Sequence, residues 1–177
     1  PMTGGMGAVA PVPLLSEAEL SRLEDEIVAP VLRGLSEDGI DYRGVLFLGV
    51  MWTADGPNLL EINVRFGDPE TQTLLPLLDG SLLAMFDAVD RRALHTWTPV
   101  WKPATAAATV VLAAPGYPGA YARNLPLHIP EVREADTYVF DAGTDRSGGR
   151  LVSSGGRVLA VTALEADIPA AVAKAYR

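Results

Sequence analysis

The chain has 177 residues, of which 49% are hydrophobic and 20% charged, so it can form one ordinary domain or two small ones and is not disordered in composition. Its net charge of −8 argues against sequence-independent nucleic-acid binding, and the absence of cysteine excludes disulfides and thiolate metal sites. No apolar run reaches the roughly 18 residues of a membrane span. We therefore expect a cytoplasmic protein with no nucleic-acid or membrane partner. It opens on a Gly-rich segment without an initiator Met, so we expect it to be cut from something longer.

The first predicted element is a loop, because residues 1–13 are rich in Gly and Pro. Residues 14–35 then carry apolar side chains spaced by three and four, which predicts a helix. Ser16 followed by Glu19 is a capping-box pattern at the start of this helix. Pro30 lies inside the run and should kink or split it.

A β-hairpin is predicted next. Residues 42–52 form an apolar run rich in β-formers, residues 55–57 (Asp-Gly-Pro) mark a turn, and residues 59–64 are a second strand. Two helices should follow, from about residue 69 to 78 and from residue 81 to 92.

The pattern changes near residue 100, which predicts a domain boundary between residues 1–100 and a small β-rich domain over residues 104–177. The second part contains apolar runs typical of strands, separated by turn signals. The predicted strands are residues 104–113, 137–141, 150–153 and 157–164, with a turn over 115–119 and a hairpin turn over 154–156. Asp167 is a predicted cap for a final helix over residues 167–176.

Chemically, the most informative residues lie at the end of the second hairpin strand. Glu61 and Asn63 are two residues apart, so both side chains should leave the same face, while Ile62 faces a core. Carboxylate and amide oxygens are ligands suited to Mg²⁺ or Mn²⁺. Arg65 continues the alternation and could bind a phosphate or acyl-phosphate oxygen through two N–H groups. A solvated polar face on an edge strand is the alternative interpretation.

Two further signals are weak individually. Pro69 suits the first position of a helix and Asp68 its cap, which would place free backbone N–H groups where anions bind, although an ordinary capped helix explains the same residues. Residues 3–7 (Thr-Gly-Gly-Met-Gly) allow close backbone approach to a ligand, but a flexible loop explains them equally. Their spacing fits neither a Walker loop nor a dinucleotide fingerprint.

Together these segments resemble the glycinamide ribonucleotide synthetase (phosphoribosylamine–glycine ligase) family. Residues 1–8 are similar to the family's Pro-Asn-Thr-Gly-Gly-Met-Gly-Ala loop, and residues 65–72 (Arg-Phe-Gly-Asp-Pro-Glu-Thr-Gln) match its signature. Further similar segments follow in the expected order, so the resemblance covers essentially the whole chain; they are residues 42–46, 113–119, 142–144 and 155–163. The implied fold class is α/β (α+β), with the C-terminal half of an ATP-grasp domain (an antiparallel sheet with helices) and a small β-rich C-terminal domain.

The resemblance also implies a reaction, that of an ATP-dependent ligase of de novo purine biosynthesis. Glycine would be joined to 5-phosphoribosylamine through glycyl phosphate, giving glycinamide ribonucleotide, ADP and phosphate. ATP is then a co-substrate and Mg²⁺ or Mn²⁺ a cofactor, with Glu61 and Asn63 as metal ligands and Arg65 as the catalytic residue that stabilises transferring phosphoryl oxygens. The implied substrate-binding residues are Asp68, Glu70, Thr71, Thr3, Gly4, Gly5 and Gly7.

The sequence departs from the family at two positions, where Met2 replaces Asn and Asp141 replaces His, and no chemistry is assigned to either. Arg157 could reach the cleft of the full enzyme, and we assign it no further role from the sequence. The family's N-terminal domain and nucleotide clamp lie upstream of these segments, so we expect little ligase activity from the isolated chain. We expect the full-length enzyme to be a monomer. The alternatives are another ATP-grasp carboxylate–amine ligase or a non-catalytic fragment.

Overall fold

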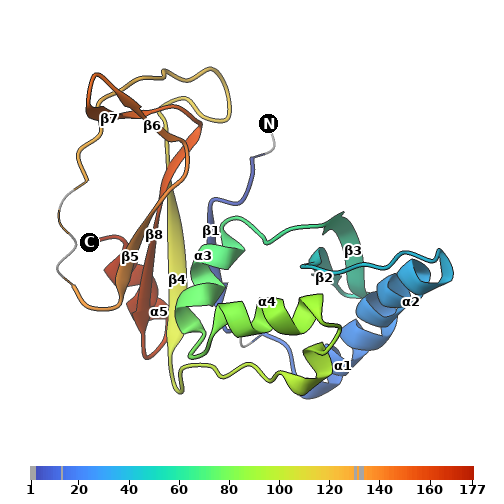
Figure 1. The fold of residues 1–177 in the computed structure, drawn as a ribbon. Coiled ribbons are helices and arrows are strands. Elements are labelled where there is room, and N and C mark those ends of the chain that lie inside the picture. The colour runs from blue at the N-terminus through green and yellow to red at the C-terminus, as the bar shows by residue number, and fades with distance from the viewer. Residues whose placement is uncertain (1–2, 13, 130, 132–133) are drawn as a thin grey trace. The chain divides into compact units, whose positions relative to one another are not determined.

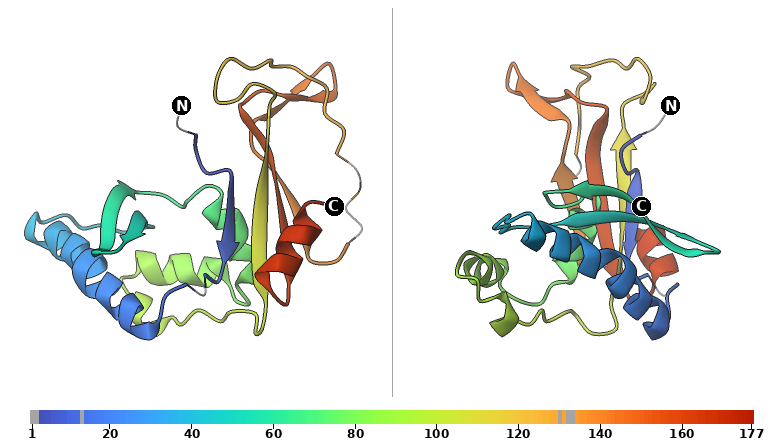
Figure 2. Two further views of the ribbon diagram at one scale, coloured as in Figure 1. Left: turned by 180° about the vertical axis from the view of Figure 1, so that it is seen from behind. Right: turned by 90° about the vertical axis from the view of Figure 1, so that its right-hand side faces the viewer.

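The computed structural model describes residues 3–12, 14–129, 131 and 134–177 (Figures 1 and 2), so Met2 lies outside the described residues. The chain folds into two compact units, which we describe separately. Unit 1 contains Pro1–Pro11, Asp68–Asp79 and Val100–Arg177, and unit 2 contains Val12–Gly67 and Gly80–Pro99. The boundaries of these units differ from those of the predicted domains, residues 1–100 and 104–177. The division into those two domains stays a prediction. None of the helices in the described residues combines the length and apolar character that a bilayer crossing requires.

Unit 1 is built on a four-stranded antiparallel sheet with the order β1-β4-β8-β5 (Figure 1). Its strands are β1 (Gly7–Ala10), β4 (Ala106–Ala113), β8 (Arg157–Glu165) and β5 (Thr137–Asp141). The last three were predicted within two residues. The prediction of a loop for residues 1–13 is wrong at β1, because its Gly and Ala residues have little strand propensity of their own. Pairing with β4, whose Ala107 lies opposite Ala10, supplies the strand instead.

Helices cover both faces of this sheet. α3 (Glu70–Leu74) continues into the 3-10 turn η2 (Leu75–Leu77), and α5 (Ile168–Ala175) lies on the opposite face (Figures 1 and 2). On the α3 side, the side chains of Ala10, Leu77, Ala107 and Leu164 form a buried cluster. Both predicted helices are confirmed, and Asp167 caps α5 by accepting a hydrogen bond from the backbone N–H of Ala170 at 2.8 Å.

Three buried threonine hydroxyls fasten α3 to the sheet. Thr73 Oγ1 lies 2.6 Å from Thr109 Oγ1, which lies 2.7 Å from Thr162 Oγ1. The Thr162 hydroxyl donates to the carbonyl oxygen of Gln72 at 3.0 Å, and Thr73 lies 3.2 Å from that of Pro69. Each hydroxyl has one hydrogen to donate, so three hydrogens serve four contacts. The three shorter contacts are all satisfied if each hydroxyl donates in one direction, from Thr73 through Thr109 and Thr162 to the Gln72 carbonyl.

Replacing Thr162 by Val should lower the free energy of local unfolding of this region by roughly 1–3 kcal/mol, because the Gln72 carbonyl loses a buried donor while side-chain size is kept. Native-state hydrogen exchange of the α3 and β8 amides in the full-length protein measures this change. Thr105→Val is the matched control, since the exposed Thr105 hydroxyl donates to the carbonyl of Pro103, where water can replace it. Equal amide protection in the two variants would contradict the hydroxyl chain.

A separate hairpin extends unit 1. β6 (Thr144–Ser147) pairs with β7 (Arg150–Ser153) through a turn at Gly148 and Gly149, whose φ values of 57° and 79° suit a tight Gly-Gly turn. β7 was predicted and β6 was not. The predicted hairpin turn over 154–156 is wrong, because β7 pairs with β6 whereas β8 pairs with β4 and β5.

Unit 2 begins with a helix that is interrupted as predicted. α1 (Glu17–Leu23), a π-helical turn η1 (Glu24–Val28) and α2 (Ala29–Glu37) follow one another. The Ser16–Glu19 capping box is present. Pro30 has no N–H to donate to the preceding turn and its ring would clash with the carbonyl there, and the wider π turn accommodates it.

The predicted hairpin of unit 2 is β2 (Phe47–Thr53) paired with β3 (Gly56–Asn63). The turn lies at residues 54–55, slightly before the predicted one. The register shifts after Gly49, where Leu60 is the extra residue of a β-bulge. Ile62 was predicted to face a core, and this is wrong, since it is 49% exposed in a two-stranded sheet. The predicted helix over 81–92 is confirmed as α4 (Leu82–Asp90), followed by the 3-10 turn η3 (Leu94–Thr96).

Candidate functional site

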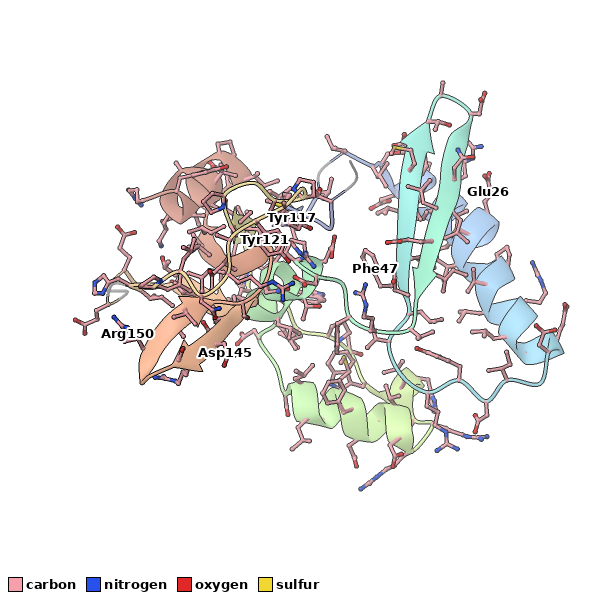
Figure 3. All side chains as sticks on the ribbon, turned by 90° about the horizontal axis from the view of Figure 1, so that it is seen from above. Glu26, Phe47, Tyr117, Tyr121, Asp145 and Arg150 are labelled. Atoms are coloured by element: carbon pink, nitrogen blue, oxygen red, sulfur yellow. The ribbon has the colours of Figure 1, made fainter. Side chains whose placement is uncertain are left out.

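The predicted metal ligands, Glu61 and Asn63, lie at the C-terminal end of β3. Glu61 pairs with Gly49 and Asn63 with Phe47 across the hairpin, whose Phe47 end is labelled in Figure 3. Both lie on the same side of the bulge, so the alternation that brings their side chains to one face is unbroken between them. The structure therefore places a carboxylate and an amide on one face of one strand.

Gly49 makes room for the Glu61 side chain. A Cβ atom at Gly49 would lie 2.8 Å from Cγ of Glu61 and 3.5 Å from its Oε1. Sequence reasoning missed this residue, although a glycine inside a strand often marks a close approach. Gly49 is thus a supporting residue for the direction in which the Glu61 carboxylate points.

Replacing Gly49 by Ala should weaken divalent-ion binding roughly 10- to 100-fold, the size of effect expected when a ligand's support is disturbed. The added methyl group displaces the Glu61 side chain but leaves its carboxylate in the protein. A Mn²⁺ titration of the full-length protein measures the change. Gly34→Ala is the control, because among the described residues no atom beyond the adjoining residues and helix backbone lies within 4 Å of a Cβ placed there. Similar affinities in both variants would contradict the role of Gly49.

Arg65 is the second residue after β3, and its side chain folds back on the end of that strand. Its Nη2 donates to Asn63 Oδ1 at 3.2 Å and its Nη1 donates to the carbonyl oxygen of Phe66 at 2.9 Å. Asn63 Nδ2 is buried and has no hydrogen-bond partner among the residues that the structure describes. An amide oxygen has two lone pairs, so Asn63 Oδ1 can accept from Arg65 and still bind a cation.

The donor set fits a hard divalent ion that keeps much of its shell for other oxygens. Within the described residues no cluster of three or more His, Cys, Asp or Glu side chains could hold a metal ion by itself. Glu61 and Asn63 supply two oxygens, which suits Mg²⁺, since that ion usually keeps several waters and binds substrate phosphates. A cation beside the Arg65 guanidinium would be repelled unless anionic oxygens lay between them, as phosphate oxygens would.

In unit 1, the carboxylate of Asp68 is held by both of its oxygens. Oδ2 accepts from Arg157 Nη2 at 2.8 Å, and Oδ1 accepts from Gln72 Nε2 at 2.9 Å. The prediction that Asp68 caps the next helix with Pro69 at its first position is wrong, because Pro69 is itself the N-cap residue, and within the described part of the chain no side chain caps α3. The Asp68 carboxylate accepts hydrogen bonds from the side chains of Arg157 and Gln72 instead of from the backbone N–H groups of α3. The five-residue α3 is also too short for the helix-end anion site considered above.

The glycine-rich residues 3–7 approach protein atoms closely. A Cβ atom at Gly5 would lie 2.5 Å from Pro69 Cδ, and one at Gly7 would lie 2.7 Å from the carbonyl oxygen of Thr109. Gly4 donates its N–H to the Tyr117 hydroxyl at 3.4 Å, and Gly5 accepts from Arg157 Nη1 at 3.1 Å. Close packing against protein atoms therefore accounts for Gly5 and Gly7, where a side chain would overlap its neighbours.

The predicted site residues therefore form two groups. The first lies in unit 2 and contains Glu61, Asn63 and Arg65, and the second lies in unit 1 and contains Thr3, Gly4, Gly5, Gly7, Asp68, Glu70 and Thr71. Glu70 and Thr71 are the half-buried first residues of α3. Sequence reasoning missed Gln72 and Tyr117 as supports, although Gln72 stands four residues after Asp68, the spacing at which side chains meet in a helical turn.

Comparison with known proteins decides the family. Residues 1–71 match the model of the phosphoribosylglycinamide synthetase ATP-grasp (A) domain, and residues 107–177 match that of the phosphoribosylglycinamide synthetase C domain. The chain belongs to the phosphoribosylglycinamide synthetase family. This confirms the resemblance found at residues 65–72, since phosphoribosylglycinamide and glycinamide ribonucleotide name the same compound.

Individual relatives agree with the phosphoribosylglycinamide synthetase family. The chain is 48% identical to a phosphoribosylamine–glycine ligase of Agrobacterium fabrum over 99% of its own length and 41% of the relative's. It is 43% identical to a trifunctional purine biosynthetic protein of Gallus gallus, covering 100% of this chain and 18% of that one. The chain thus spans less than half the length of each of these relatives.

Solved structures support the same family and fold. A phosphoribosylamine–glycine ligase from Thermotoga maritima superposes with a TM-score of 0.83 at 34% identity, over 99% of this chain and 43% of that one. A biotin carboxylase from Campylobacter jejuni superposes with a TM-score of 0.66 at 12% identity, over 96% of this chain and 36% of that one, which shows the fold alone. The predicted α/β class with antiparallel sheets is confirmed.

Proposed function

We propose that this chain is the C-terminal portion of an ATP-dependent ligase that joins glycine to 5-phosphoribosylamine, giving glycinamide ribonucleotide, ADP and phosphate. The observation that carries the proposal is the match of residues 1–71 to the model of the phosphoribosylglycinamide synthetase ATP-grasp (A) domain, a range that includes the polar face of Glu61 and Asn63. The Agrobacterium fabrum relative is itself named as a phosphoribosylamine–glycine ligase.

The proposal includes the two predicted domains. Residues 1–100 would complete an ATP-grasp domain, and residues 104–177 would form the small β-rich domain. Support comes from the two family models, which match residues 1–71 and 107–177. We also propose that the full-length enzyme is a cytoplasmic monomer that binds ATP, glycine and 5-phosphoribosylamine, in keeping with the metabolic enzymes that this chain resembles.

Glu61 and Asn63 would hold Mg²⁺ or Mn²⁺ through Oε and Oδ1 atoms. The bound ion would neutralise phosphate charge, which otherwise repels the substrate carboxylate. Glu61 contributes a negative charge, whereas Asn63 contributes an oxygen without charge. Asn63 Oδ1 also accepts a hydrogen bond from Arg65 Nη2, so the proposed metal ligand Asn63 and the Arg65 guanidinium are held next to each other.

Arg65 would stabilise the oxygens of the phosphoryl group that is transferred to the glycine carboxylate. A guanidinium presents a planar fork of N–H donors that matches two oxygens at once. Its Nη1 and Nη2 are each held by the chain, which limits the number of orientations that the fork can take. Acyl phosphate formation needs no side-chain nucleophile, so orientation and charge are what the protein must supply.

Asp68 would orient the amine of a substrate. Both of its oxygens are already held, so the carboxylate is fixed, and the side chain is still 44% exposed and open to a ligand. Each carboxylate oxygen has a second lone pair for an ammonium or amine donor. Glu70, Thr71 and the backbone of Thr3, Gly4, Gly5 and Gly7 would complete the surroundings of this substrate.

The test is release of ADP by the full-length ligase that contains this chain. We expect release only when ATP, glycine and 5-phosphoribosylamine are present together, and little release from the isolated chain. Omitting each substrate in turn is the control. Release that requires a different acid or amine would instead support another ATP-grasp carboxylate–amine ligase, and no release with any acid would support a non-catalytic fragment.

A further inference from the structure

The guanidinium of Arg157 connects two segments of the predicted substrate-binding group, which contain Gly5 and Asp68. It is the first residue of β8, and its side chain is 24% exposed. Nη1 donates to the carbonyl oxygen of Gly5 at 3.1 Å and to that of Asp68 at 2.9 Å. Nη2 donates to the Asp68 carboxylate at 2.8 Å. One guanidinium therefore binds two backbone carbonyls and one carboxylate, from segments that lie 152 and 89 residues away in sequence.

The geometry requires an arginine at this position. Two neighbouring nitrogens of one planar group serve three acceptors, two of which belong to the same residue. The single ammonium of lysine is a compact point charge and cannot reproduce this fork. A Cβ atom at Gly4 would lie 3.0 Å from Cζ of Arg157, so the glycine-rich segment lies directly against the guanidinium.

A second contact limits the same segment from another side. The Tyr117 hydroxyl accepts the Gly4 N–H at 3.4 Å. The Tyr117 ring lies over Gly156, where any side chain would overlap it, and makes an edge contact with Tyr121 at a centroid distance of 5.9 Å (Figure 3). Residues 156 and 157 thus support the Gly4–Gly5 backbone through two independent contacts.

We propose that Arg157 is a positioning residue of the ligase reaction, which holds the Gly5 carbonyl and the Asp68 carboxylate in a fixed relation to each other. The inference rests on the proposed function, because only there do Asp68 and the glycine-rich segment bind a substrate. Arg157 acts through these two groups. Removing its guanidinium takes one side-chain donor from the Asp68 carboxylate, which keeps its hydrogen bond from the Gln72 amide, and takes the Arg157 donor from the Gly5 carbonyl.

The first experiment measures steady-state kinetics of full-length enzyme carrying Arg157→Met, which keeps the length of the stem and removes the guanidinium. We expect kcat/KM for the substrate that Asp68 binds, tested with glycine and 5-phosphoribosylamine in turn, to fall roughly 10- to 100-fold, the loss expected for charge-assisted hydrogen bonds. The KM for ATP should change little. Arg157→Lys keeps the charge and should fall between wild type and Arg157→Met.

Two further measurements separate positioning from general damage. Because Arg157 acts through Asp68, adding Arg157→Met to Asp68→Asn should lower kcat/KM little beyond Asp68→Asn alone. Hydrogen exchange at residues 3–7 should become faster in Arg157→Met and stay unchanged in the control Arg150→Met, whose exposed side chain lies on the β6–β7 hairpin (Figure 3).

The outcomes are distinguishable from a failure of the proposed function. Wild-type enzyme that releases no ADP in the presence of glycine and 5-phosphoribosylamine would overturn the proposed function. With active wild-type enzyme, unchanged kcat/KM for both substrates in Arg157→Met would overturn this inference alone. Fully additive effects of Arg157→Met and Asp68→Asn would also overturn it, because Arg157 would then act independently of Asp68. Unchanged exchange at residues 3–7 would overturn the link to Gly5.

Discussion

Replacing Glu61 by Gln in the full-length ligase should lower activity at a fixed Mg²⁺ concentration roughly 100-fold, equivalent to about 2.7 kcal/mol of transition-state stabilisation. Gln keeps the shape of the side chain and removes the negative charge that balances a divalent cation. Part of the loss should be recovered at higher Mg²⁺, since the change weakens ion binding. Asn63→Ala removes a neutral oxygen donor and should give a smaller loss of the same kind.

The Mg²⁺ dependence of ADP release measures both effects. Asn58→Ala is the matched control for Asn63→Ala, because Asn58 lies on β3 beyond the bulge, where its amide donates to the Thr53 hydroxyl and the Gly56 carbonyl. Unchanged Mg²⁺ dependence in both Glu61→Gln and Asn63→Ala would contradict the assignment of metal ligands. A similar loss in Asn58→Ala would assign the effect to the hairpin itself.

Replacing Arg65 by Ala should lower kcat roughly 10²- to 10³-fold, the range found when a donor to developing transition-state charge is removed. The effect should fall on kcat more than on the KM for glycine, because the charge on the transferring phosphoryl group changes during the reaction. Arg65→Lys should recover only part of the rate, since an ammonium cannot bind two oxygens in a fixed plane. Single-turnover measurement of ADP formation isolates the chemical step.

The control for Arg65 is Arg33→Ala, an exposed arginine of α2. An Arg65→Ala enzyme with wild-type kcat and a raised KM for ATP would contradict the catalytic role and would assign Arg65 to ground-state binding of the nucleotide. Because Arg65 donates to Asn63 Oδ1, its removal should also shift the Mg²⁺ dependence slightly.

Features set by neighbours in sequence were predictable. The Ser16–Glu19 capping box depends on residues three apart, and β5 and β7 were predicted with their observed bounds because their apolar and β-branched residues are contiguous. The position of the Glu61 and Asn63 side chains on one face of β3 also follows from local alternation. That these two side chains bind a metal ion stays a prediction.

Features set by distant partners were not predictable. β1 is a strand because β4 lies beside it, and no pattern in its four residues indicates this. Asp68 has the local character of a helix cap, but Arg157, 89 residues away, takes its carboxylate. The same contact explains why sequence alone indicated only that Arg157 could reach the cleft of the full enzyme, and not that it binds Asp68. In each case the decisive interaction joins residues far apart along the chain.

The buried hydroxyl chain of Thr73, Thr109 and Thr162 has a consequence for sequence variation within the family. Losing one hydroxyl leaves a buried partner without a hydrogen bond, whereas replacing several together removes donors and acceptors at once and is milder. Serine keeps the hydroxyl and should be accepted at any of the three positions. Apolar residues should instead occur at these positions in combination, so that three sites on α3, β4 and β8 evolve as one unit.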